Sequence, residues 1–371
     1  KSSAASDVYK RQTTDDTLTL KVNNTVMSGW SHIRVTRGIE RLPSDFELSL
    51  TDWYPQEGFQ LAPPGSSCTI FIGDDRVMTG YVDQWVNTLT PQSHDIRVTG
   101  RGMCQDLVDC AAWWENNMIK GGDALAIIRK LASVYGITVT TDIDSFTTVP
   151  DFVINWGESS QQIIDRICRY EGLLYYDLPD GSLFLTRAGT ASAASGVTQG
   201  VNLQKAEYTR SMNERFSEYT GLSVSVNSLS ELSPASGYDS VLLATARDPE
   251  AAGMRTRRHV TIVESTLMTT GCAQQAVNWE MNRRYGRSMA LNVTVDGWRD
   301  SAGTLWQPNT FVPVSIPALG ADSLNWLVSE VTFSRDDETG TAASLVLMPA
   351  EAFSVQPYRF YSGVAGRDVS S

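Results

Sequence analysis

The sequence predicts a mainly β protein of the α+β class, in which two small β-barrels flank a module of helices and strands. Three observations predict this class. Short segments of alternating apolar residues fill the first hundred residues and return after residue 204. A helical apolar stripe lies between these regions and recurs 36 residues later. Gly, Asn, Asp and Pro separate nearly all the segments, as turns require.

The first β-barrel is expected to span residues 15–104. Gly73, Asp74 and Asp75 tolerate turn geometry, so the segments on either side of them should form a hairpin. Gly100 and Gly102 are expected to break the last strand. Six segments alternate between apolar and polar residues, the pattern of half-buried strands in a small barrel or sandwich: 18–22, 31–37, 46–50, 68–72, 76–83 and 94–98.

Residues 105–203 are predicted to form a duplicated helix-strand module. Apolar residues at i, i+1 and i+4 mark a helix stripe within 127–132, and the same stripe recurs within 163–168. Gly136 and Gly172 follow where a left-handed helix cap would lie. Each helix should lead into a strand, and the second strand should turn at Pro179-Asp180-Gly181 into another. The polar, small-residue stretch 188–200 is interpreted as an exposed connection near a domain boundary. The predicted strands of the module are 137–140, 173–177 and 182–186.

The second β-barrel is expected over residues 204–355, with one inserted helix over 269–285. Val277 and Met281 share a helical face, and Gly286 is expected to stop the helix. A Ser- and Pro-rich stretch, 228–237, is predicted to be a surface loop. The expected strands are 207–210, 219–226, 289–295, 311–316, 326–333 and 343–347.

The two ends of the chain show no structural pattern. Residues 1–14 are small and polar without a period, and are interpreted as a disordered tail or an expression remnant. Residues 356–371 are interpreted as a C-terminal tail. No segment reaches the roughly 20 apolar residues needed to cross a bilayer, and the N-terminus lacks the layout of a signal peptide. We therefore expect no membrane insertion and synthesis in the cytoplasm.

Composition excludes several classes. The chain has 371 residues, of which 42% are hydrophobic and 19% charged, as in globular proteins. Its net charge of -12 opposes tight nucleic-acid binding, which depends on Lys and Arg. Five cysteines without a secretory signal indicate core thiols rather than disulfides. The Cys104/Cys110 spacing matches no zinc motif and the three histidines are far apart, so we expect no metal and no cofactor.

No catalytic constellation is recognisable. Asp106 and Asp109, with Asp83 and Asp95 near them in sequence, offer carboxylates of the kind that glycoside hydrolysis requires. Nothing in the sequence fixes the separation of any pair, so we interpret them as carboxylates at strand ends and a helix N-terminus. No Gly-x-Ser-x-Gly elbow is present. The expected protein is therefore not an enzyme, and no catalytic residue is assigned.

Two other features suggest binding surfaces. The basic run Arg255, Arg257 and Arg258, followed by His259, is interpreted as a solvated or subunit-facing patch rather than a phosphate site. The duplicated module loosely resembles LysM-like repeats, which bind peptidoglycan. Aromatic rings serve as sugar platforms or, more commonly, pack in cores and interfaces. The chain has ten tryptophans, among them Trp30, Trp53, Trp85, Trp113, Trp114, Trp156 and Trp306.

Several strings, in this order and spacing, resemble the tail baseplate hub proteins of contractile-tailed phages, the late-control tail protein family. The resemblance is strongest to the hub of Mu-like phages and covers about residues 16–353. One departure is Gly102-Met103, where related hubs tend to carry a polar pair. The strings are Gly80-Tyr81-Val82-Asp83, Gly100-Arg101, Asp106-Leu107-Val108-Asp109-Cys110, Asn213-Glu214-Arg215-Phe216-Ser217-Glu218-Tyr219 and Leu305-Trp306-Gln307-Pro308-Asn309.

The resemblance implies a structural protein that forms a homotrimeric ring. Two similar barrels per chain would give six in the ring, so that a hexameric tail tube could sit on a trimeric central spike. The module would face outward, toward surrounding baseplate proteins, and DNA would pass through the ring without specific binding. The expected location is the virion tail baseplate, assembled in the host cytoplasm. The alternative is a tail component that binds or degrades the cell wall, that is, peptidoglycan.

Overall fold

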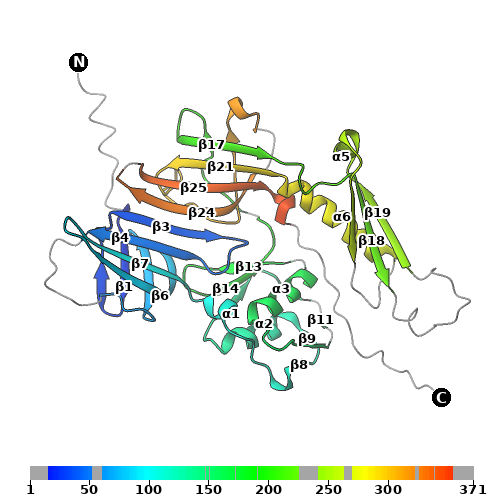
Figure 1. Ribbon diagram of the computed structural model, residues 1–371, viewed down its shortest axis with the longest axis horizontal. Coiled ribbons are helices and arrows are strands. Elements are labelled where there is room, and N and C mark those ends of the chain that lie inside the picture. Colours follow the sequence, from blue (N-terminus) through cyan, green and yellow to red (C-terminus); the bar gives the residue numbers. More distant parts are fainter. Residues whose placement is uncertain are drawn as a thin grey trace, which may run out of the picture.

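The computed structural model describes most of the chain (Figure 1). The predicted terminal tails and the predicted loop 228–237 lie outside the described residues. No helix in the described part is both long enough and apolar enough to cross a membrane. The described residues are 16–51, 61–146, 148–149, 151–171, 173–189, 191–224, 241–262, 270–321, 326–337 and 339–353.

The strands of the first β region lie close to their predicted positions. Each predicted segment is a strand, and the hairpin turn is confirmed, with Gly73 at φ +59°. The strands are β1 (Leu18–Val22), β2 (Thr25–Met27), β3 (His32–Gly38), β4 (Asp45–Thr51), β5 (Ser67–Ile72), β6 (Asp75–Leu89) and β7 (His94–Gly102).

Strand β7 continues through Gly100, where the sequence predicted a break, and ends at Gly102. A Cβ atom on Gly100 would lie 2.2 Å from the Tyr81 carbonyl oxygen and 2.5 Å from the Phe46 ring. A Cβ atom on Gly102 would lie 2.3 Å from Oδ2 of Asp177. These glycines therefore allow close packing against neighbouring groups rather than a turn.

The second β region supplies the other long strands. The predicted strands 207–210, 289–295, 326–333 and 343–347 are confirmed, whereas the predicted strand 311–316 is divided into two short strands at Pro313. The hairpin between the last two strands is also confirmed, with Gly340 at φ +69°. The strands are β15 (Ala191–Ser192), β16 (Val197–Thr198), β17 (Leu203–Arg210), β21 (Met289–Asp296), β22 (Thr310–Val312), β23 (Val314–Ser315), β24 (Trp326–Asp336) and β25 (Gly340–Pro349).

The two β regions share one sheet, which corrects the expectation of two separate barrels. Its order is β17-β21-β25-β24-β3-β4-β7-β6-β5-β1-β2, and β22 and β15 extend it from β24. The described strands follow an open path in which no barrel closes. The reason is that β24 pairs antiparallel with β3 of the other region instead of closing on its own (Figure 1).

Within this sheet, two five-strand units have the same order. The first unit is β3, β4, β5, β6 and β7, and the second is β17, β21, β22, β24 and β25. Numbered along the chain, each runs first-second-fifth-fourth-third across the sheet. Each fourth strand also carries a register shift against its fifth, between Val82 and Gln84 in one unit and between Val328 and Glu330 in the other. The units are therefore structural repeats.

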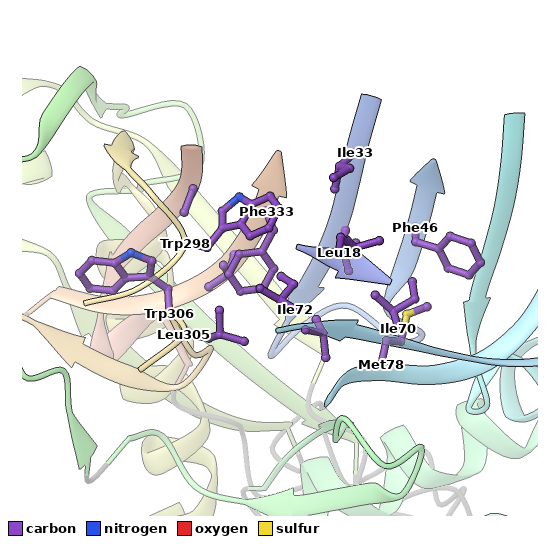
Figure 2. Close-up of a cluster of buried hydrophobic side chains, with 14 of the residues drawn as sticks. Leu18, Ile33, Phe46, Ile70, Ile72, Met78, Trp298, Leu305, Trp306 and Phe333 are labelled. Carbon is purple, nitrogen blue, oxygen red and sulfur yellow. The ribbon is translucent and has the colours of Figure 1, made fainter. Parts of the chain in front are cut away.

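A single core lies against one face of both units. Figure 2 shows side chains of the first region, such as Leu18 and Ile72, gathered with Leu305 and Phe333 of the second. Alternate residues of each strand point into this cluster, as the period of two requires. Trp298 is fully buried there and donates from Nε1 to the carbonyls of Ser334 and Ala342, both at 3.0 Å. The two regions are therefore joined by a common core as well as by a common sheet.

The module packs around its own core, and its duplicated helices are confirmed. The stripe residues of α2 and α3 are all buried, Ile127 being the most exposed at 5%. Gly136 caps the first helix at φ +69°, and Gly172 lies outside the described residues. Strand β14 pairs parallel with β10 and antiparallel with β13. The elements are α1 (Gln105–Asp109), η3 (Glu115–Asn117), β8 (Met118–Ile119), β9 (Gly122–Asp123), α2 (Ala124–Ser133), β10 (Val139–Thr141), β11 (Thr148–Val149), β12 (Phe152–Val153), α3 (Ser160–Glu171), β13 (Leu174–Asp177) and β14 (Leu183–Thr186).

The connection 188–200 is less exposed than predicted. Its strands β15 and β16 pair parallel with β22 and β23. Val197 is fully buried, and a Cβ atom on Gly196 would lie 2.2 Å from the Pro313 carbonyl oxygen. Small residues here admit a close backbone contact, which the composition alone does not distinguish from a loop.

A side sheet, β19-β18-β20, extends from the second region (Figure 1). The buried Val277 and the half-buried Met281 of α6 pack against its Tyr219. Helix α6 continues one residue past Gly286, which was predicted to stop it. A Cβ atom on Gly286 would lie 2.3 Å from the backbone nitrogen of Ala352, so the glycine allows this segment to pack closely on the helix. The remaining elements are β18 (Glu218–Val224), β19 (Val241–Arg247), α5 (Pro249–Met254), β20 (Arg258–Ile262), α6 (Thr270–Arg287), η4 (Pro317–Leu319) and η5 (Ala350–Phe353).

Candidate assembly surfaces

The contact between β24 and β3 forms a seam between the two units. Six residue pairs, from Glu330↔Gly38 to Arg335↔Ile33, align the strands antiparallel. Side chains reinforce it, since the Thr36 and Thr332 hydroxyls lie 3.2 Å apart and Arg41 donates to Glu330 at 3.3 Å. The fourth strand of one unit thus meets the first strand of the next unit.

Two strand edges correspond to the two sides of this seam but have no strand partner among the described residues. They belong to β6 and β17. Strand β6 pairs with β5 only as far as Tyr81, and its next residue, Val82, exchanges backbone hydrogen bonds with the segment 65–66. Residues 84–89 pair only with β7. Strand β17, the first strand of the second unit, pairs only with β21. An open strand edge presents backbone groups to any strand that can reach it.

The sheet face opposite the core carries paired charges. Arg34 lies 2.6 Å from Asp45 and 3.6 Å from Glu47. Arg97 lies 3.6 Å from the other oxygen of Glu47. These residues alternate with the buried positions of β3, β4 and β7, so they share one face. The face is polar, and both of these arginines have an acidic partner.

Two of the predicted carboxylates, Asp83 and Asp109, bind one arginine where the first unit meets the module. Arg101 donates from Nε to Asp83 at 2.7 Å, and from Nη2 to Asp109 at 2.8 Å. Asp95 accepts from Thr51 and Ser93 instead. An acid pair across a scissile bond is therefore not formed by Asp83 and Asp109, because a guanidinium group lies between them.

Burial raises the pKa of Asp106, and the charge of Asp109 raises it further. Asp106 lies in the first turn of α1, where a carboxylate is favoured by the free backbone N–H groups.

A buried aspartate makes the second contact of this joint. Ser44 donates to Asp177 from its backbone nitrogen at 3.0 Å and from its hydroxyl at 2.7 Å. Burial raises the pKa of Asp177, while these hydrogen bonds and the charge of Arg37 oppose the shift. Sequence patterns did not single out Asp177, because it reads as an ordinary strand end.

The string that ends at Asn309 connects the module to the second region. Asn309 adopts φ +63°, accepts from the Gly189 nitrogen at 2.7 Å and donates to the Arg187 carbonyl at 3.1 Å. Gln307 accepts from the buried Arg37 at 3.5 Å. This string therefore holds the exit of the module against the sheet.

The basic run is structural. Arg257 donates to the carbonyls of Met212 and Arg215 and, through its other nitrogen, to Asn213. Arg258 pairs with Glu218 at 2.9 Å on an exposed surface. These contacts place the charges on the side sheet and leave no converging set of arginines for a phosphate.

Tryptophans divide between core and surface. Trp30 and Trp306 are buried, and Trp85 and Trp114 are half-buried against the cores. Trp53 lies outside the described residues. The exposed ones belong to the module, where Trp113 is 65% exposed and Trp156 is 92% exposed.

The cysteines behave as core thiols wherever they are buried. Cys68, Cys104 and Cys168 are buried, Cys110 is half-buried, and none of these four forms a disulfide. Burial raises the pKa of Cys68 to about 12. Within the described residues, no group of three His, Cys, Asp or Glu side chains is arranged to hold a metal ion.

One cleft, of about 450 Å³, opens between the first unit, the module and α6. Its charged residues are paired, with Arg283 and Arg287 both bound to Glu40. Tyr175 donates to Asp165 at 3.2 Å, and burial raises the pKa of its hydroxyl. These contacts are those of a packed junction.

Three family models of phage baseplate proteins match parts of this chain. The Mu phage baseplate assembly protein GpP-like N-terminal model matches residues 17–102, the baseplate hub protein gp44-like second-domain model matches 104–187, and the Mu phage baseplate assembly protein GpP fourth-domain model matches 269–356. The baseplate hub protein gp44 of Escherichia phage Mu is 29% identical over 347 residues, which cover 92% of this chain and 89% of gp44.

Solved structures agree. The 43 kDa tail protein of prophage MuSo2 from Shewanella oneidensis has a TM-score of 0.81 and 28% identity, over 91% of this chain and 99% of that one. A tail protein from Neisseria meningitidis MC58 shares the fold, with a TM-score of 0.78 and 20% identity over 92% and 99% of the two chains. So does the Escherichia coli c3393 protein, a type VI secretion component, at 0.53 and 9% over 92% and 78%.

The fold and these matches define a structural protein of the phage tail. The chain belongs to the family of baseplate hub proteins of Mu-like phages. Its place is therefore the tail baseplate of the virion.

Proposed function

We propose that three copies of this chain form a closed hub ring that adapts the hexameric tail tube to a trimeric central spike. The repeat of the two five-strand units carries this proposal. Three chains with two units each give six similar units, so one face of a threefold ring matches a sixfold tube. Head-to-tail contacts close into a ring when their rotation is a whole fraction of a turn.

The polar face of the sheet is proposed to line the ring. Paired charges such as Arg34 with Asp45 and Arg97 with Glu47 present little net field to a passing polyanion. DNA would then move through during ejection without displacing many counterions, and would not bind tightly. The module, joined to the first unit at Arg101 and Asp177, is proposed to face outward toward surrounding baseplate proteins.

Light scattering and negative-stain imaging of the purified chain test the ring. The hub predicts three times the chain mass of 40.8 kDa and ring-shaped particles with six similar lobes around a channel. A monomer at every concentration, or an assembly whose copy number is not a multiple of three, would exclude the trimeric ring. Assembly in the host cytoplasm predicts that the ring forms in cell extract without any exported partner.

The cell-wall alternative has one supporting observation, the exposure of Trp113 and Trp156 on the module. If these two indole rings bind glycan strands, the chain should sediment with purified peptidoglycan sacculi, and Trp156→Ala should abolish this co-sedimentation. A purely structural hub predicts that wild type and variant both stay in the supernatant. Release of soluble sugar fragments would show a wall-degrading activity instead.

A further inference from the structure

We infer that residues 84–89 of β6 pair antiparallel with residues 206–211, which are the end of β17 and the residue that follows it, in a second copy of the chain. In this register Gln84 faces Ser211, Val86 faces Thr209 and Leu89 faces Ala206. The pairing rests on the proposed ring, and it specifies which strands make the contact between subunits.

The internal seam supplies the template. Strand β24 is the fourth strand of the second unit, and it pairs with β3, the first strand of the first unit. Strand β6 is the fourth strand of the first unit, and β17 is the first strand of the second. If the units repeat around a ring, β6 must meet β17 of the next copy just as β24 meets β3 within one chain.

The β6 side of the register follows from the matching bulges. Each bulge leaves one residue without a cross-strand partner, Asp83 in β6 and Ser329 in β24. Setting these two residues equivalent matches Gln84 with Glu330, and Leu89 with Arg335, five residues further along. The segment of β24 that pairs with β3 therefore corresponds to residues 84–89 of β6.

The β17 side of the register follows when the equivalence between the two units is extended from each strand to the strand paired with it. The bulge alignment sets Val98 of β7 equivalent to Leu345 of β25, and both are fully or almost fully buried. Their next neighbours, Leu48 of β4 and Val293 of β21, are then equivalent and are also buried.

One further step reaches the edge strands. Ile33 of β3 pairs with Leu48, and Ala206 of β17 pairs with Val293, so Ile33 and Ala206 are equivalent. By the same count Gly38 corresponds to Ser211. Replacing each residue of the internal seam by its equivalent converts Arg335↔Ile33 into Leu89↔Ala206, and Glu330↔Gly38 into Gln84↔Ser211.

The side chains suit this contact. Leu89 is 78% exposed, and the pairing places it opposite Ala206, which packs at the margin of the core. Trp85 faces Arg210, whose guanidinium can lie against the indole ring. Six pairs form, as many as in the internal seam. A second copy also satisfies the backbone groups of two edges that are open among the described residues.

A disulfide test reads the register directly. Val86→Cys with Thr209→Cys, in a Cys110→Ser background, places two thiols directly opposite each other, at a Cβ separation of about 5 Å. Within one chain these strands are seven strand spacings apart, about 34 Å, so a bond between them joins two copies. Mild oxidation with diamide should give covalent dimers and then trimers on non-reducing gels.

The control pair is Gln84→Cys with Glu207→Cys, in the same background, which the register separates by four residues, about 13 Å. Its cross-linking should be at least about tenfold lower at equal oxidant. Each single cysteine variant shows whether other thiols of the chain contribute to the cross-linking. A thermal melt of the reduced proteins shows whether each variant is folded.

The outcomes separate the two proposals. A trimer that cross-links through residues 86 and 209 supports the pairing. A trimer by light scattering that does not cross-link there, or that cross-links better through the shifted pair, overturns the pairing and leaves the ring. A protein that is monomeric at every concentration overturns the ring, and the pairing with it.

Discussion

Arg215 and Asp248 form a two-pronged ion pair that is almost completely shielded from solvent. Nε and Nη2 of the arginine donate to the two carboxylate oxygens, both at 2.9 Å. The side chains are 1% and 4% exposed. Asp248 also accepts from the Glu250 and Ala251 nitrogens at the start of α5, so this one carboxylate orders both the strand connection and the helix.

Arg215→Ala should destabilise the side sheet severely. It leaves the Asp248 charge buried without its partner, which costs about 3–5 kcal/mol. Urea unfolding followed by far-UV circular dichroism measures the loss. The matched control is Arg258→Ala, since Arg258 is 74% exposed and pairs with Glu218 on the surface, where a loss of at most about 1 kcal/mol is expected. Equal losses in the two variants would contradict this account.

Gly100→Ala should lower the free energy of unfolding by about 3 kcal/mol or more, because the added methyl group meets the Tyr81 carbonyl and cannot be accommodated by a side-chain movement. Gly122→Ala is the control, since a Cβ atom there meets nothing within 4 Å. Thermal melts of both variants test the difference. If Gly100→Ala melts with the wild type, Gly100 does not serve the close contact.

Asp177→Ala should loosen the joint between the first unit and the module. The change strands the Ser44 N–H and hydroxyl without an acceptor, at a cost of about 1–3 kcal/mol. Asp177→Asn keeps one acceptor oxygen and should lose less. Hydrogen exchange read by mass spectrometry should show faster exchange at the peptide that contains Ser44. Unchanged exchange there would argue against the joint.

His259 should make the side sheet sensitive to acid. Burial lowers its pKa below the ordinary 6.5, and the charge of Arg284 lowers it further, while Glu280 and Glu214 act in the opposite direction. The folded state therefore favours the neutral ring, and stability present above about pH 6.5 is lost as the pH falls through the folded pKa. His259→Gln should show a smaller drop in melting temperature between pH 7 and pH 5. An identical drop would refute the assignment.

Charges at the open edges should control assembly if β6 and β17 pair. Val86→Lys combined with Thr209→Lys sets like charges opposite each other and should weaken the trimer more than about tenfold. Val86→Lys combined with Thr209→Glu should restore it. Sedimentation velocity over a concentration series reads the difference. If the Val86→Lys, Thr209→Glu variant assembles no better than the double lysine variant, the result would contradict this register.

Much of the local structure could be predicted from the sequence. Alternation located nearly all the long strands, and the repeated stripe located α2 and α3. This works because the spacing of apolar residues within an element shows which of its faces is buried. Strands β19 and β20 were not foreseen. Both pair with β18, and the cluster of Tyr219, Ala244 and Val277, which joins β18, β19 and α6, brings together residues that are far apart in the sequence.

The seam and the joint could not be predicted in this way. Alternation tells which side of β24 is buried but not which strand lies beside it, so the pairing of β24 with β3 is invisible in either segment. Gly100 reads as a strand breaker because the Tyr81 carbonyl that it admits comes from another strand. Asp83 and Asp109 read as spare acids because Arg101 reaches them only in the folded chain.

The seam also sets the order of events during synthesis. Thr36 and Thr332, which touch across it, are 296 residues apart in the chain. At about 5–20 residues per second, β3 emerges from the ribosome roughly 15–60 s before its partner strand exists. Throughout that interval the first unit has an uncovered edge on the β3 side. The last strands to be made therefore protect the first from pairing with nascent neighbours, and truncated chains should aggregate rather than fold.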